Sequence, residues 1–166
     1  MEVRSIETIV RVLNAAKVKY LIVGGVAVSA HGYDRLTADV DLVIGLQPEN
    51  IARALAALHS AGWRMSIPVT AEEFANPKLR ESWRKDKNMI VLKMWSDEHR
   101  RTPIDIFVYE PFDFQKEFAR AKWEPVAGKI RAPIVAYKTL LAMKRRAGRD
   151  RDLLDIQALK KLDPYR

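Results

Sequence analysis

The chain has 166 residues, of which 48% are hydrophobic and 30% charged, a composition typical of a single globular domain that can bury its own core. It contains no cysteine, which excludes disulfides, zinc–thiolate sites and cysteine nucleophiles. No apolar run approaches the roughly 20 residues that span a bilayer, so we expect no membrane partner. The absence of cysteine favours a cytoplasmic location.

The net charge of +8 is concentrated at the end of the chain. Residues 129–166 contain 11 Lys or Arg and 4 Asp, a net +7, which leaves +1 for the first 128 residues. A basic segment of this kind is typical of proteins that bind nucleotide phosphates or a nucleic-acid backbone, although a solvated helix surface would also produce it.

The hydrophobic pattern predicts helices and strands that mix without strict alternation. The expected helices are residues 5–16, 26–32, 48–61, 112–121, 133–147 and 151–162, with Asp150 as the N-cap of the last. The expected strands are 20–23, 39–46, 63–69, 89–95 and 104–109, followed by a hairpin around Gly128.

Residues 71–88 show no clean period and are interpreted as a long loop. Together the elements predict a single α+β domain over residues 1–166, with a central mixed sheet flanked by helices. Residues 1–128 would form its α/β core, and residues 129–166 a basic pair of helices belonging to the same domain.

Two aspartates interrupt the most strand-like segment of the chain. Because strand side chains alternate between faces, Asp39 and Asp41 share the face opposite the apolar positions, and Asp105 has the same relation to its own strand. If the two strands are neighbours in register, three carboxylates converge and repel one another unless a cation neutralises them. Oxygen ligands favour Mg²⁺ or Mn²⁺ over zinc. The alternative is that Asp39 and Asp41 lie on a solvent-facing edge and Asp105 is unrelated.

Gly24 and Gly25 follow an expected strand and precede an expected helix. Glycines in this position let a phosphate approach the backbone, although an ordinary tight turn has the same sequence. The segment has neither the Gly-Lys-Ser/Thr of a P-loop nor the spaced glycines of a dinucleotide fingerprint.

The combination resembles the nucleotidyltransferase superfamily related to DNA polymerase β, and more closely its AbiEii-type subgroup. Two segments at opposite ends of the chain carry the resemblance, together with the strand of Asp105. The matching residues of the first are Gly24, Gly25, His31, Gly32, Arg35, Thr37, Asp39 and Asp41. Those of the second are Lys144, Arg149, Asp152 and Asp155, with Lys138 as a rival for the lysine position.

The resemblance implies a nucleotidyltransferase fold and a Mg²⁺- or Mn²⁺-dependent transfer of a nucleoside monophosphate, from ATP or another nucleoside triphosphate, to an acceptor hydroxyl. Asp39, Asp41 and Asp105 would be the metal-binding and catalytic residues. The residues implied to bind nucleotide are Gly24, Gly25, Arg35, Thr37, Lys138, Lys144, Arg149 and Asp152. The acceptor would be an RNA 3′ end, notably tRNA, a protein hydroxyl or a small molecule, and the protein would be the toxin of a pair with a protein antitoxin.

Three assignments stay open. Many superfamily members have serine where this chain has Gly25, which favours the alternative of a non-catalytic nucleotide- or RNA-binding regulatory protein on the same fold. His31 is interpreted either as a hydrogen-bonding residue of the loop or as a structural histidine. Asp152 and Asp155 would equally serve as a helix N-terminal charge and a salt-bridge partner.

Overall fold

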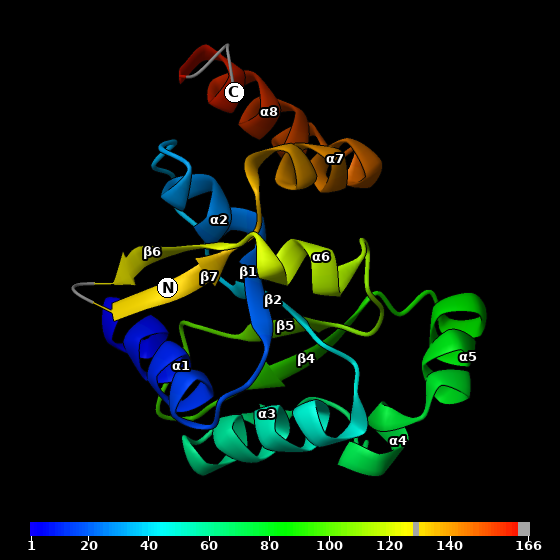
Figure 1. Cartoon of the computed structure of the whole chain (residues 1–166). Helices are drawn as coiled ribbons and strands as arrows, with labels where there is room; N and C mark the ends of the chain where they lie inside the picture. The colour runs from blue at the N-terminus through cyan, green and yellow to red at the C-terminus, as the bar shows by residue number, and fades with distance from the viewer. Residues whose placement is uncertain (128–129, 163–166) are drawn as a thin grey trace.

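The computed structural model describes residues 1–127 and 130–162 (Figure 1). Within these residues seven strands form one mixed sheet in the order β3-β4-β5-β2-β1-β7-β6. The strands are β1 (Tyr20–Val23), β2 (Val40–Ile44), β3 (Arg64–Met65), β4 (Val91–Trp95), β5 (Ile104–Phe107), β6 (Lys122–Ala127) and β7 (Ile130–Ile134). The pairs β2–β5 and β1–β7 are parallel, and the other neighbours are antiparallel.

Eight helices accompany this sheet in the described part of the chain. They are α1 (Val3–Ala15), α2 (Gly24–Ala30), α3 (Pro48–Ser60), α4 (Ala71–Ala75), α5 (Pro77–Lys87), α6 (Phe114–Ala119), α7 (Tyr137–Ala147) and α8 (Asp150–Leu162). In Figure 1, α2, α7 and α8 gather at one end of the molecule, and α1 and α3 lie at the other. None of the helices described is long and apolar enough to cross a membrane.

The central strands are buried on both faces, because helices pack on the sheet from either side. All four residues of β1 are buried, and β2 buries Val40, Leu42, Val43 and Ile44 but leaves Asp41 partly exposed. The α+β class with a mixed sheet, predicted from the pattern, is therefore confirmed. Asp41 therefore lies on a central strand whose neighbouring residues are buried, so its backbone is held firmly by the core.

Several boundaries differ from the expected ones. The strand expected over 63–69 shrinks to Arg64–Met65, and Asp39 precedes β2 instead of belonging to it. The helix expected from residue 133 begins at Tyr137, because residues 130–134 pair with β1 and β6. The strands of the hairpin around Gly128 are present, while Gly128 itself lies outside the described residues. Helix α8 begins with Asp150, one position before the expected start.

The prediction of a long loop over residues 71–88 is wrong, because this segment forms α4 and α5. Thr70 and Glu73 make a reciprocal capping box that starts α4, and the Asn76 side chain accepts hydrogen bonds from the first backbone N–H groups of α5. These caps begin helices that are too short and too polar for periodicity to reveal. The buried side chains of the segment are Phe74, Arg80 and Trp83.

Candidate metal and nucleotide site

Asp41 and Asp105 are paired residues on the neighbouring parallel strands β2 and β5. Equivalent positions in register point to the same face of a sheet, so both carboxylates emerge together. Asp39, which precedes β2, joins them, and one carboxylate oxygen from each of the three residues lies within 4.8 Å of the others. The register that the sequence required for a three-carboxylate cluster is present.

The cluster concentrates negative charge around Asp41. Burial raises the pKa of Asp41 to about 6, with further contributions from the charges of Asp39 and Asp105. A hydrogen bond from the backbone N–H of Gly25 and the positive charge of Lys144 oppose the rise in pKa. The site therefore holds a carboxylate that a bound cation would stabilise.

Gly24 and Gly25 lie directly against the cluster, and neither position has room for a side chain. Gly24 has a φ of +61°, and a Cβ there would lie 1.8 Å from Oδ2 of Asp41. A Cβ on Gly25 would lie 2.3 Å from Oγ1 of Thr37 and 3.0 Å from Nη2 of Arg35. Thr37 and Arg35 thus fill the space that a serine at position 25 would need, which gives a steric reason for the glycine.

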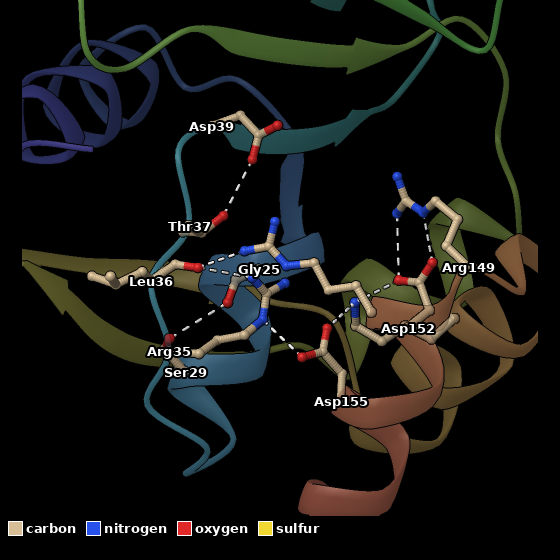
Figure 2. Close-up of polar contacts among 11 residues, drawn as sticks. Gly25, Ser29, Arg35, Leu36, Thr37, Asp39, Arg149, Asp152 and Asp155 are labelled. Atoms are coloured by element: carbon tan, nitrogen blue, oxygen red, sulfur yellow. Dashed lines mark hydrogen bonds and ion pairs between the residues drawn. The ribbon is translucent and has the colours of Figure 1, made fainter.

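The loop between α2 and β2 is fixed by side chains from within it (Figure 2). The Thr37 hydroxyl donates to Oδ1 of Asp39 over 3.2 Å, and the Arg35 guanidinium donates to the carbonyl oxygen of Leu36 over 3.0 Å. Arg35 also forms an ion pair with Asp155 of α8, with 2.8 Å between Nε and Oδ1. Helix α8 therefore helps to position the loop that carries Asp39.

A buried ion network joins α7 to α8 beside this loop. Nζ of Lys144 lies 3.0 Å from Oδ1 of Asp152 and 2.7 Å from Oδ2 of Asp155, and Arg149 binds Asp152 with 2.7 Å between Nε and Oδ2. The side chains of Lys144, Asp152 and Asp155 are at most 6% exposed. Burial alone would raise the pKa of Asp152, but hydrogen bonds from Arg149 and Lys144 lower it below the ordinary value.

The two candidate lysines of α7 lie in different surroundings. Lys144 is buried and lines the cleft described below, whereas Lys138 is exposed and lies outside the residues that line it. A ring nitrogen of His31, Nε2, lies 2.8 Å from the carbonyl oxygen of Val135, and its ring packs edge-on against Tyr137. These contacts agree with the structural interpretation of His31.

The cluster opens into a cleft of about 620 Å³. Asp39, Asp41 and Asp105 line it together with Gly24 and Gly25. It is also lined by Asp152, by the basic or hydroxyl side chains of Arg35, Thr37, Lys144, Arg146, Arg149 and Arg151, and by apolar side chains that include Ile90, Phe107, Tyr109 and Met143. Carboxylates that can hold a cation therefore share one cavity with basic groups that can hold phosphate and an apolar surface that can take a ring.

The motifs missed Lys93 of β4, which lies beside the cluster. Lys93 and Asp105 are paired residues of antiparallel β4 and β5, and Nζ of Lys93 lies 2.6 Å from Oδ1 of Asp105. A hydrogen bond with Asp105 raises the pKa of Lys93, so its ammonium stays charged. Alternation within VLKMW already placed Lys93 opposite the buried Leu92 and Met94, but only the β4–β5 register brings it to Asp105.

Comparison with other proteins shows the fold. No family model and no curated protein sequence matches the chain. Among solved structures, the antibiotic-resistance factor ANT(2'')-Ia aligns with a TM-score of 0.64 at 13% identity, covering 96% of this chain and 82% of that one. The lincosamide antibiotic adenylyltransferase LnuA aligns with a TM-score of 0.56 at 15% identity, covering 95% of each chain.

An antigenic nucleotidyltransferase-like protein from Paracoccidioides brasiliensis aligns with a TM-score of 0.54 at 18% identity, covering 97% of this chain and 76% of that one. The chain has the nucleotidyltransferase fold. Likeness at these identities concerns the fold alone, so the AbiEii-type subgroup suggested by the motifs stays a prediction.

Proposed function

We propose that the protein is a nucleotidyltransferase, dependent on Mg²⁺ or Mn²⁺, that transfers a nucleoside monophosphate from a nucleoside triphosphate to an acceptor hydroxyl. The observation that carries this proposal is the pairing of Asp41 with Asp105 across β2 and β5, with Asp39 beside them, at a cleft that basic and apolar side chains also line.

The residues of the cluster fit a hard divalent cation. Their three carboxylates offer oxygen atoms within 4.8 Å of one another, and burial, with repulsion from Asp39 and Asp105, raises the pKa of Asp41. The chain has no cysteine, and the imidazole of His31 is engaged by Val135, so a zinc-type donor set is not offered here. When bound, Mg²⁺ would neutralise phosphate charge and act as a Lewis acid.

The roles proposed for the chain's own residues follow from their positions. Asp39 and Asp41 anchor the cation, and Asp105 takes the proton of the attacking hydroxyl. The acceptor oxygen forms a bond to the α-phosphorus, while the bond from that phosphorus to the leaving pyrophosphate breaks. Lys144 and Arg149 provide positive charge on the opposite side of the cleft.

The bare glycine backbone and the loop complete the proposed nucleotide site. Gly24 and Gly25 line the cleft, and phosphate would approach their main chain beside the side chains of Asp41, Arg35 and Thr37 that lie over them. Arg35 and Thr37 line it as well, and Thr37 holds Asp39 through its hydroxyl. Asp152 acts through the two cations that it holds, Lys144 and Arg149. Lys138 is exposed outside the cleft, and we propose no role for it.

For the acceptor hydroxyl we propose chemical classes and no single molecule. The motifs favour an RNA 3′ end such as that of tRNA, and Arg146, Arg149 and Arg151 would suit its backbone. The structural neighbours point instead to a small molecule, since ANT(2'')-Ia was solved with adenylyl-2''-tobramycin and LnuA with lincomycin. A toxin paired with a protein antitoxin is a proposal that rests on the motifs alone, and a small regulator in the neighbouring reading frame would support it.

The test is incubation of the full chain with each radiolabelled nucleoside triphosphate, Mg²⁺ and, separately, total RNA, aminoglycosides and lincosamides. We expect label to enter one acceptor class and to be lost in Asp39→Ala and Asp105→Ala. Asp34→Ala, which removes an exposed aspartate from the same loop, is the matched control and should retain transfer. Absence of Mg²⁺-dependent triphosphate binding by calorimetry would refute the proposal.

The second candidate is a non-catalytic nucleotide- or RNA-binding protein on the same fold. The ion pair between Lys93 and Asp105 favours it, because this pair neutralises one carboxylate without any metal. A binding protein of this kind would take up nucleotide or RNA equally with and without Mg²⁺, and would transfer no label to any acceptor.

A further inference from the structure

Lys93 places a permanent positive charge on one side of the carboxylate cluster. Strands β4 and β5 lie side by side in Figure 1, and their register pairs Lys93 with Asp105. The Lys93 ammonium lies 2.6 Å from Oδ1 of Asp105, and the lysine side chain is 53% exposed while the aspartate is 13% exposed. The ammonium therefore approaches the cluster from its solvent side.

Each carboxylate of the cluster already has one partner in the protein. Asp39 accepts a hydrogen bond from the Thr37 hydroxyl, Asp41 from the backbone N–H of Gly25, and Asp105 from Lys93. Of these three donors only Lys93 carries a charge. Among the described residues, Asp105 is thus the one member of the cluster that forms an ion pair with a basic side chain.

The charges of the cluster balance with one divalent ion. Three ionised carboxylates carry three negative charges, and Lys93 neutralises one of them. A single divalent cation then neutralises the other two. Removal of Lys93 leaves one charge uncompensated and an additional oxygen of Asp105 available as a ligand, which favours binding of a further cation.

We propose that Lys93 takes the place of a second divalent cation at Asp105, so that the cluster binds one such ion instead of two. The inference rests on the proposed function and deepens it, because it assigns the charge on the Asp105 side of the reaction to a side chain. Lys93 is a positioning residue in this scheme: it holds Asp105 toward the acceptor while the divalent cation is held by Asp39 and Asp41.

The test counts Mn²⁺ ions bound per chain, by electron paramagnetic resonance of the metal that stays free during a titration of the full-length protein with Mn²⁺ alone. We expect one Mn²⁺ for the wild type and for Lys93→Arg, which keeps the charge, and two for Lys93→Met. Lys85→Met is the matched control: it breaks an exposed ion pair within α5, with 2.5 Å between Lys85 Nζ and Glu81 Oε1, whose residues do not line the cleft, and it should leave the count at one.

The outcomes separate this inference from the proposed function. Two Mn²⁺ in the wild type, or one in Lys93→Met, would overturn the role of Lys93 and leave the transferase proposal standing. No Mn²⁺ bound to either protein would overturn both. An added ion in Lys93→Met that disappears again in Lys93→Met with Asp105→Asn would place the new ligand at Asp105.

Discussion

Gly25 and Thr37 occupy complementary space, because the Cβ that Gly25 lacks would lie 2.3 Å from the Thr37 hydroxyl and 2.7 Å from its Cβ. The Thr37 hydroxyl donates to Asp39, so the small residue at position 25 and the orientation of Asp39 are linked through one side chain. The glycine is thus compatible with an active site in which the neighbouring loop supplies the hydroxyl.

We expect Gly25→Ser to destabilise the protein by about 1–3 kcal/mol, the usual range for overpacking. Gly25→Ser combined with Thr37→Gly should be less destabilised than the sum of the two single variants, with a coupling of about 1 kcal/mol or more. Urea denaturation of all four proteins measures this cycle. Additive effects would show that the two residues do not share the space.

Asp41→Asn should stabilise the metal-free protein at neutral and higher pH. The folded-state pKa of Asp41, about 6, lies above its ordinary value of 3.8, so the folded protein retains the proton longer and its stability falls as the pH rises from about 4 to about 6. We expect Asn to recover roughly 1–3 kcal/mol above this window, from about 1.4 kcal/mol per pKa unit. The gain should shrink toward pH 4, and an equal gain at both pH values would contradict the expected cause.

Affinity for Mn²⁺ should increase with pH through about 6. The carboxyl of Asp41 must lose its proton to bind a cation, and burial with two neighbouring charges raises its pKa to about 6. Below that value we expect affinity to fall by up to about tenfold per pH unit. Calorimetric titrations at several pH values measure the slope, and a flat profile from pH 5 to 7 would exclude Asp41 as a ligand.

The carboxylate cluster could be predicted because it depends on strand alternation, which the sequence records directly. Asp41 and Asp105 needed only the assumption that two strands are neighbours, whereas Asp39 precedes β2 and joins them from the loop. To predict that Lys93 lies beside Asp105 one would also have to know the register between β4 and β5, which no local sequence pattern fixes. The ion network of Lys144 and Asp155 depends on how α7 and α8 pack together, so the motif could suggest the residues but not their contacts.

Helices α4 and α5 could have been predicted from their capping residues, which are a local feature of the sequence. The hydrophobic periodicity did not reveal them. Thr70 and Glu73 stand at capping-box spacing, and Asn76 precedes a proline, which together mark two helix starts. With only Phe74 buried in α4, no apolar stripe could form. For α4 and α5 the residues that cap a helix were therefore more informative than the hydrophobic pattern.

Thr70→Ala should lower stability by about 1 kcal/mol, because it removes the acceptor for the Glu73 backbone N–H at the start of α4. Thr8→Ala is the matched control, since Thr8 is a threonine within α1 whose hydroxyl bonds only the preceding turn, at the carbonyl oxygen of Arg4. We expect little change there. Chemical denaturation compares the two, and equal losses would show that the cap makes no specific contribution.

Asp155 should be the most sensitive of the buried acids of α8. Its carboxylate binds both Arg35 and Lys144 while only 2% exposed, so Asp155→Ala removes the counter-charge of Arg35 and one counter-charge of Lys144, which keeps Asp152. Breaking a buried pair in this way costs about 3–5 kcal/mol. Asp97→Ala is the control, because Asp97 and Arg100 form a pair that is more than 70% exposed at both ends, and exposed pairs contribute about 0–1 kcal/mol.

The loss in Asp155→Ala should extend to the cleft, since Arg35 belongs to the loop that carries Thr37 and Asp39. At temperatures where the variant is still folded, we expect weaker Mn²⁺ binding than in the wild type, although Asp155 is not among the three clustered carboxylates. Calorimetry with Mn²⁺ measures this effect. Unchanged Mn²⁺ affinity in a folded Asp155→Ala protein would show that the loop holds Asp39 without help from α8.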